Sequence, residues 1–136
     1  MIVIVCLDHK NGMMFNRRRQ SRDRFLCRRV LELTKGRVLR MNRYSANQFD
    51  GMEIPHASIS ETFLQEASDG EYCFVENNTL RPYEANMEEL IVFRWNKTYP
   101  SDVRLDLDLE RAWKLVHREE FSGYSHDIIG MEVYKR

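Results

Sequence analysis

One carboxylate lies where a helix is predicted to begin, and it is the first candidate for chemistry. Asp23 could serve as a general acid, or it could anchor a heterocycle by hydrogen bonds in a cleft. Its alternative role is structural, because an acid in the first turn of a helix complements the helix dipole and can pair with a neighbouring arginine. General acid chemistry needs a desolvated carboxyl group, and the arginines on both sides of Asp23 argue against desolvation. The sequence therefore favours the structural role and leaves Asp23 as its single catalytic candidate.

A second candidate site could hold a phosphate group. Ser45 and Gln48 have the spacing of a capping box, which predicts a helix that begins at Ser45 and ends near Gly51. The unpaired amides of a helix start and the guanidinium group of Arg43 would together suit a dianion. An ordinary helix cap beside a solvated arginine is the alternative.

Arginines crowd the segment 17–29, in which Asp23 is the one acid. The basic patch that we single out consists of Arg17, Arg18, Arg19 and Arg22. Such a surface could bind the phosphates of RNA or of a nucleotide. The alternative is a solvated loop and helix face whose charge is balanced by acids elsewhere, and the formal net charge of zero favours that view.

Other residue types indicate packing rather than catalysis or metal binding. The histidines are scattered without the paired spacing of a zinc site. The acids between residues 102 and 110 alternate with leucines and lack the glycine and the spacing of a calcium loop. Cys6, Cys27 and Cys73 form no Cys-x-x-Cys pair, and two of them lie in apolar stretches. We therefore expect no metal site, reduced thiols and a cytoplasmic location.

The composition is typical of one folded domain spanning residues 1–136. The chain has 136 residues, of which 43% are hydrophobic and 31% charged, and this excludes a disordered or low-complexity chain. Lys and Arg number 21, as do Asp and Glu, so the whole molecule is not drawn to nucleic acid or to an anionic membrane. No apolar run is long enough to span a bilayer, so no membrane partner is expected, and the oligomeric state is left open.

Predicted strands and helices alternate along the chain. The apolar run 1–7 predicts a strand buried on both faces at the centre of a parallel sheet. Further strands are predicted at 38–41, 55–59, 72–75, 90–95 and 103–109, and helices at 21–35, 45–51 and 60–67, with a short one around 82. Ser21 is the predicted cap of the first helix, and residues 113–134 predict an antiparallel hairpin. The pattern indicates an α/β fold with a mainly parallel central sheet, helices on both faces and a C-terminal antiparallel hairpin.

This order of elements resembles the dihydrofolate reductase superfamily across nearly the whole chain. Asp23 falls where that family keeps the acid that holds the pteridine. The segment 42–45 falls at the family's Gly-Arg-x-Thr turn, which holds cofactor phosphate, and 74–77 falls where a family strand ends in Gly-Gly. The resemblance implies a dihydrofolate-reductase-like three-layer fold, with NADPH as a candidate cofactor on this ground alone. The ligand- or phosphate-binding candidates that follow are Arg43, Ser45, Asn42, Asn77 and Asn78.

Several residues depart from the family pattern at the pterin and cofactor sites. Glu76 and Asn77 bring bulk, and Glu76 a negative charge, to the glycine pair that would let the backbone approach a pyrophosphate. Phe93 occupies the position of the family's threonine, which supports the acid found here at Asp23. Cys27 occupies the position of the family's stacking aromatic residue. These departures imply that folate reduction has been lost.

The chain is also similar to short bacterial proteins that carry the label ribonuclease Z, but it lacks the His-x-His-x-Asp-His zinc motif of that enzyme class. The favoured hypothesis is a protein that binds a nucleotide or other phosphate-bearing small molecule in its cleft. One alternative is an RNA-binding or RNA-processing accessory that uses the arginine stretch 17–29. Another is an NADPH-dependent reductase of a non-folate substrate.

Overall fold

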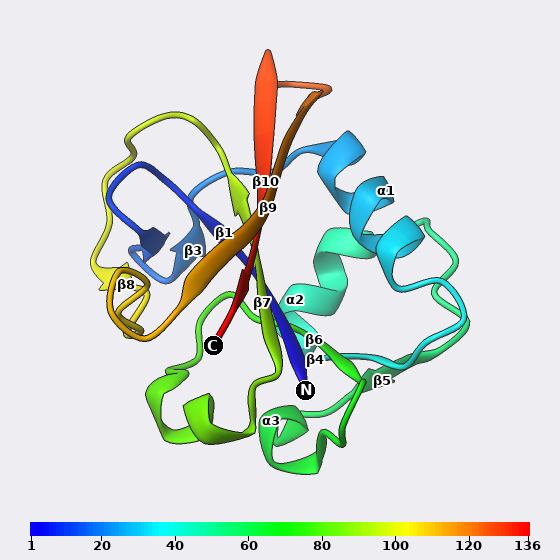
Figure 1. Cartoon of the computed structure of the whole chain (residues 1–136). Coiled ribbons are helices and arrows are strands. Elements are labelled where there is room, and N and C mark those ends of the chain that lie inside the picture. The colour runs from blue at the N-terminus through cyan, green and yellow to red at the C-terminus, as the bar shows by residue number, and fades with distance from the viewer.

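The computed structural model describes residues 1–136, arranged around a seven-stranded sheet (Figure 1). In spatial order its strands are β5 (Ala57–Ile59), β4 (Leu39–Met41), β6 (Tyr72–Phe74), β1 (Ile2–Leu7), β7 (Glu89–Arg94), β10 (Ile128–Lys135) and β9 (Lys114–Ser122). A separate three-stranded sheet contains β3 (Arg18–Arg19), β2 (Gly12–Phe15) and β8 (Val103–Arg104). The helices are α1 (Arg24–Leu33), α2 (Arg43–Ala46) and α3 (Phe63–Glu66), with 3-10 turns η1 (Asn47–Phe49) and η2 (Arg81–Asn86).

Strand β1 lies at the centre of the large sheet. It pairs parallel with β6 on one side and with β7 on the other. Because side chains alternate along a strand, Val3 and Val5 pack on one face and Ile4 on the other, and all three are fully buried. The prediction of a central strand buried on both faces is confirmed.

Helices cover both faces of this sheet. Helix α1 and turn η1 bury Leu26, Val30 and Phe49 against one face. Helix α3 buries Phe63 and Leu64 against the other. The predicted α/β fold, with a mainly parallel sheet between helices, is confirmed.

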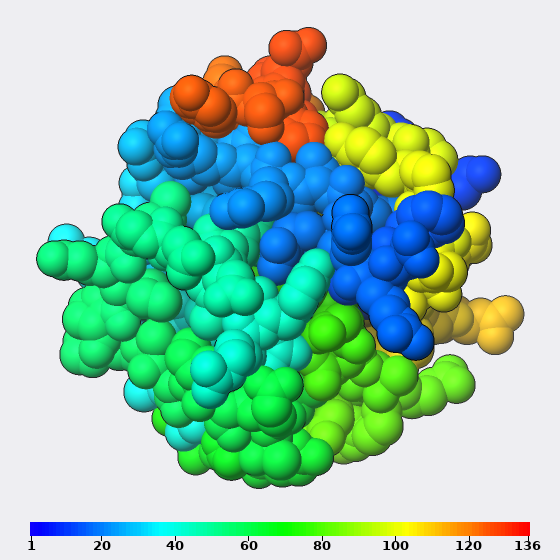
Figure 2. Space-filling model, turned by 180° about the vertical axis from the view of Figure 1, so that it is seen from behind, coloured from blue at the N-terminus to red at the C-terminus, as the bar shows by residue number.

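The C-terminal hairpin closes one edge of the sheet. Strand β10 pairs antiparallel with both β7 and β9, as predicted. Residues 123–127 join the two strands of the hairpin. Figure 2 shows this tip, in orange, lying against the light-blue beginning of α1. The hairpin thereby brings residues from the end of the chain to the first helix.

Three helix starts differ from those predicted. Helix α3 begins at Phe63 rather than at residue 60. Helix α1 begins at Arg24 and is capped by Asp23 rather than Ser21, because the Asp23 carboxylate accepts hydrogen bonds from the next amides of the helix. Helix α2 begins at Arg43 and is capped by Asn42, whose side chain accepts from the amide of Ser45. Asn and Asp cap helices as well as Ser does, so the sequence offered competing starts within three residues.

The alternating leucines from 105 to 109 do not form a strand. The strand β8 covers only Val103–Arg104 and pairs with β2 in the small sheet. Leu105, Leu107 and Leu109 are buried in the core from an irregular segment. The Asp106 carboxylate anchors this segment by accepting hydrogen bonds from the backbone amides of Leu80 and Arg81. The shortest bond from each amide measures 2.9 Å. Apolar periodicity alone could not separate a strand from a segment anchored in this way.

None of the helices has the length and apolar character needed to cross a membrane.

Candidate functional site

A buried ion pair occupies the carboxyl edge of the sheet, at the end of β6. Glu76 is only 7% exposed, and its carboxylate accepts from Arg19 Nε at 2.8 Å and from Arg19 Nη2 at 3.0 Å. Gln48 Nε2 donates to the same carboxylate at 3.2 Å. The guanidinium group of Arg19 also lies 4.4 Å from the centre of the Tyr44 ring and donates to the Tyr44 carbonyl oxygen. These side chains fill the place where a parallel sheet would hold a ligand.

Arg19 therefore differs from the other members of the predicted basic patch. Arg17 and Arg18 are exposed at the turn that joins β2 and β3, and Arg22 is exposed before α1. Arg19 lies inward and neutralises Glu76. The structure thus splits the patch into one internal arginine and three surface arginines.

The three asparagines of the predicted phosphate site lie together. Asn42 Nδ2 donates to Asn77 Oδ1 at 2.9 Å and to Asn78 Oδ1 at 3.3 Å. Asn42 Oδ1 accepts from the amide of Ser45 at 2.9 Å. Their side chains tie the end of β4 to the end of β6. The side-chain amide of Asn42 is used within the protein, whereas the Nδ2 groups of Asn77 and Asn78 donate to no other group of the protein.

Ser45 and Arg43 are not arranged as the capping-box prediction expected. The amide of Ser45 is taken by Asn42, and Ser45 is fully buried with no hydrogen-bond partner for Oγ. Arg43 is exposed, and its amide donates to Glu61 Oε2 at 2.9 Å. Arg43 forms no ion pair with Glu76, whose partner is Arg19. The expectation that Ser45 offers a free amide at a helix start is wrong, because the asparagine three residues earlier caps the helix.

Asp23 is held by groups from two distant parts of the chain. Its side chain is 0% exposed. It accepts hydrogen bonds from the amides of Phe25, Leu26, Tyr124 and Ser125, from Ser125 Oγ and from His126 Nδ1. Burial by itself would raise the pKa of Asp23, but the bonds from Tyr124, His126, Ser125 and Leu26 outweigh burial and hold the pKa well below its usual value of 3.8. The expected arginine partner is wrong, since the ionisable side chain that contacts the Asp23 carboxylate is His126, with Nδ1 at 3.0 Å.

His126 connects Asp23 to two hydroxyl groups. Its Nε2 atom lies 3.0 Å from Ser21 Oγ and 3.2 Å from the Tyr99 hydroxyl. The Trp95 ring stacks on the imidazole with centroids 4.7 Å apart. His126 is 6% exposed. Sequence reasoning missed this arrangement, since Asp23 and His126 are separated by 103 positions and no local spacing relates them.

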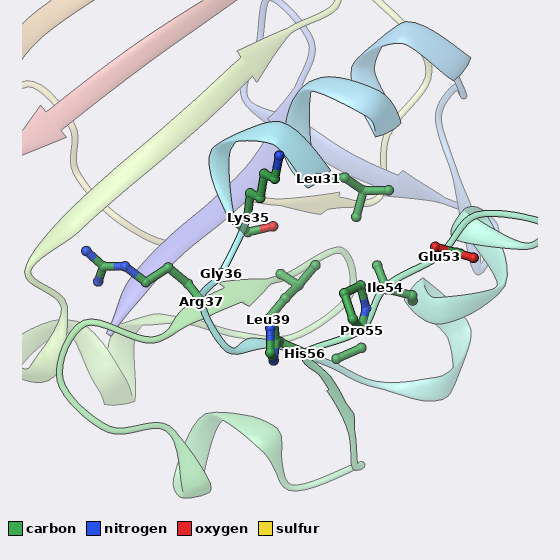
Figure 3. A pocket seen from close by; sticks show the side chains of 11 residues that line it. Leu31, Lys35, Gly36, Arg37, Leu39, Glu53, Ile54, Pro55 and His56 are labelled. Atoms are coloured by element: carbon green, nitrogen blue, oxygen red, sulfur yellow. The ribbon is translucent and has the colours of Figure 1, made fainter.

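Three pockets open beside α1. One, of about 440 Å³, lies at the beginning of the helix; it is lined by Arg22, Asp23, Arg24, Cys27, Gln48, Asp50, Met52, Tyr124 and Ser125. A second, of about 410 Å³, lies between the end of α1 and residues 53–57 (Figure 3). The third, of about 580 Å³, lies between α1 and residues 50–53. The second and third contain none of the predicted site residues. The first contains Asp23 and Arg22, which makes it the better candidate for a ligand site.

No group of three or more His, Cys, Asp or Glu side chains is arranged to hold a metal ion. The three cysteines are unpaired thiols, and burial raises the pKa of Cys27 to about 11 and that of Cys73 to about 12. Neither thiol is therefore poised as a thiolate nucleophile.

No protein-family model matches the chain, and no curated protein matches its sequence. Among solved structures, the dihydrofolate reductase from Enterococcus faecalis in complex with NADP(H) and RAB-propyl is similar, with a TM-score of 0.70. The match covers 99% of this chain and 95% of that reductase, at 11% sequence identity. At 11% identity, this similarity shows a shared fold and says nothing about the residues of the site. The chain therefore has the fold of dihydrofolate reductase.

Proposed function

We propose that this protein binds a nucleotide or another phosphate-bearing small molecule in the pocket of about 440 Å³ at the beginning of α1, and that folate reduction has been lost. The observation that carries this proposal is the lining of the pocket. Arg22 and Arg24 line it together with Tyr124, which is 61% exposed. Neither arginine takes part in an ion pair with a carboxylate.

Each of these groups suits one part of a nucleotide. Guanidinium groups bind phosphate by charge-assisted hydrogen bonds. The face of an exposed aromatic ring offers a base a stacking surface. Tyr124 already receives the guanidinium group of Arg24 at 4.8 Å from its centre and the Phe25 ring at 5.4 Å. Asp50 also lines the pocket and repels a phosphate placed beside it, so we place the phosphate on the arginine side.

The residues do not fit the dinucleotide cofactor that the fold suggests. The Glu76 carboxylate and its Arg19 partner lie at the strand end where the backbone would have to approach a pyrophosphate. Both oxygen atoms of Asp23 accept hydrogen bonds from the helix or the hairpin, so neither is free to bind a pterin. These two facts support the loss of folate reduction and speak against reduction of another substrate with NADPH. The unpaired cysteines agree with the cytoplasmic location that forms part of this proposal.

The test is a binding titration with ADP, adenosine, pyrophosphate and inorganic phosphate, followed by calorimetry and by the shift in melting temperature. We expect ADP to bind most tightly, since it engages both the arginines and Tyr124. The double variant Arg22→Ala/Arg24→Ala should weaken ADP binding by about 10-fold or more, which corresponds to loss of charged hydrogen bonds. Arg111→Ala, an 89%-exposed arginine elsewhere, is the matched control and should leave binding unchanged. If Arg43→Ala instead weakens ADP binding, the phosphate binds at the turn 42–45 and not at the beginning of α1.

RNA binding is the second candidate, and one observation favours it. Arg24 lies over Tyr124 and Arg28 lies 5.5 Å from the Phe25 ring centre, so arginines and exposed aromatic rings alternate on this surface. That combination is typical of single-strand binding. A short single-stranded RNA should then bind with an affinity that falls steeply with salt, and Arg17→Ala/Arg18→Ala should reduce the slope. An affinity for RNA no greater than that for free nucleotide would leave the small molecule as the ligand.

A further inference from the structure

Ser21, His126 and Asp23 form a continuous hydrogen-bonded chain. Ser21 Oγ lies 3.0 Å from His126 Nε2, and His126 Nδ1 lies 3.0 Å from Asp23 Oδ2. A hydroxyl, an imidazole and a buried carboxylate in this order are the parts of a nucleophilic serine site, which is recognised by geometry on unrelated folds. We propose that Ser21 is a nucleophile activated by His126 and positioned by Asp23, and that the protein hydrolyses small carboxylic esters that carry a negative charge. The inference goes beyond the proposed binding function and does not depend on it.

Asp23 is placed to act as the positioning residue. Its carboxylate is inaccessible to solvent and accepts from backbone amides of α1 and of the hairpin, which favour the ionised form. An ionised Asp23 keeps a proton on His126 Nδ1 and so leaves the lone pair of Nε2 directed at the hydroxyl groups. Trp95, stacked on the imidazole, restricts rotation of the ring.

Tyr99 shares His126 Nε2 with Ser21. Both hydroxyl groups are within hydrogen-bond distance, at 3.2 Å and 3.0 Å, but one lone pair accepts one proton well. Tyr99 therefore competes with Ser21 in the resting protein. Removal of the Tyr99 hydroxyl group should leave His126 Nε2 to Ser21 alone and so raise the reactivity of Ser21. If the cluster only stabilised the fold, this removal would not make Ser21 more reactive.

The surroundings of Ser21 also provide access and hydrogen-bond donors. Ser21 is partly exposed, whereas His126 and Asp23 are buried behind it. The backbone amides of Ser21 and Arg22 donate to no other group of the protein, so they are available to an oxyanion that develops beside Oγ. Arg22, the next residue, is exposed and supplies the positive charge that would select an anionic ester.

The reaction transfers an acyl group without any change of oxidation state. Ser21 Oγ forms a bond to the ester carbonyl carbon as its proton moves to His126 Nε2. The bond between that carbon and the alcohol oxygen then breaks, and His126 returns the proton to the departing alcohol. Water attacks the acyl-serine in the second half, giving one proton to His126 and releasing the acid, after which His126 reprotonates Ser21.

The test uses a fluorophosphonate probe, which modifies activated serine hydroxyl groups, with intact mass and peptide mapping as the readout. We expect one adduct on the full chain, located at Ser21 and absent from Ser21→Ala. His126→Gln should slow the labelling on the order of 10²-fold, the scale of a lost general base. His117→Gln, an exposed histidine of the hairpin, and Ser122→Ala, an exposed serine near its tip, are the matched controls and should label like the wild type.

Tyr99→Phe keeps the proposal testable even if His126→Gln fails to fold. That variant should label at Ser21 at least as fast as the wild type, because it removes the competitor for Nε2 and keeps the aromatic ring. Hydrolysis of a panel of activated acetate and succinate monoesters, followed by alcohol release, should show the same order among the variants. Folded wild-type protein that gives no adduct, or an adduct at another residue, overturns the proposal.

Discussion

At the scale of single residues, the pair of Arg19 and Glu76 determines what the carboxyl edge of the sheet can do. Both side chains are largely buried, at 16% and 7% exposure. Removing one charge from a buried pair leaves the other without compensation, and this is costly. The pair fills the carboxyl edge of the sheet, at the end of β6, with side chains of the protein itself.

We predict that Arg19→Met lowers the free energy of unfolding by about 3–5 kcal/mol, the usual cost of an uncompensated buried charge. The double variant Arg19→Met/Glu76→Met should recover most of this loss, since neither charge remains. Urea unfolding of the wild type, both single variants and the double variant measures the coupling directly. Arg18→Met, an exposed neighbour with no ion pair, should change stability by less than about 0.5 kcal/mol. Additive losses in the double variant would contradict the role of the pair.

Asp23 makes the stability depend on pH in a defined direction. Its pKa in the folded protein is held below the usual 3.8, because hydrogen bonds outweigh burial. A depressed pKa stabilises the fold above the pKa of the unfolded chain, and this contribution is lost as the pH falls. We expect the wild type to lose on the order of 2 kcal/mol through Asp23 between about pH 5 and pH 2. Asp23→Asn should be less stable than the wild type at neutral pH and show a smaller decrease over that interval in urea titrations.

At the scale of elements, the contact between the hairpin tip and α1 determines the position of His126. Gly123 lies at this contact. A Cβ atom added there would come within 2.5 Å of the His126 carbonyl oxygen and 2.8 Å of Asp23 Oδ2. Neither neighbour can move freely, because the first is backbone and the second is held by several donors.

We predict that Gly123→Ala destabilises the protein by about 1–3 kcal/mol, the range for overpacking. It should also separate His126 from Asp23, which would slow the labelling of Ser21 without removing the serine. Ser122→Ala, one residue away and exposed, is the control and should have little effect on either measurement. Thermal unfolding together with probe labelling checks both parts, and wild-type values for Gly123→Ala would mean that the hairpin tip is not seated as described.

At the scale of the whole molecule, the fold and the site chemistry are separable. The backbone follows that of a dihydrofolate reductase over 99% of the chain, at 11% identity. A fold hosts many functions, and the residues at the site decide among them. Here the strand end holds Arg19 and Glu76, and the acid of α1 is bound to the hairpin.

We predict that the protein does not reduce dihydrofolate. On the proposed function, the Glu76 carboxylate would obstruct a pyrophosphate at the strand end, and Asp23 would have no free oxygen atom for a pterin. The absorbance of NADPH in the presence of dihydrofolate should fall no faster with this protein than in a blank without protein. An active dihydrofolate reductase assayed in parallel is the control. Turnover at ordinary enzyme rates would show that the Arg19–Glu76 pair opens for the cofactor.

The order of strands and helices was predictable from the sequence because it depends on short-range patterns. The run 1–7 has no polar face, which requires a central strand, and the hairpin from 113 to 134 follows from two apolar segments around a glycine. Helix starts were less certain, since Asn42, Asp23 and the nearby serines are all good caps. The leucines from 105 to 109 were misplaced, because alternating burial also occurs in an irregular segment that is anchored at Asp106.

The pairing of side chains across the molecule was decided by the tertiary structure alone. Glu76 pairs with Arg19, 57 positions away, and forms no ion pair with Arg43. Asp23 meets His126 across 103 positions because the hairpin folds back onto α1. Many arginines and several histidines could have been the partners, and local spacing does not distinguish them. The sequence by itself determined the layers of this protein, whereas the packing of distant segments determined which polar groups meet, and with them the candidate chemistry.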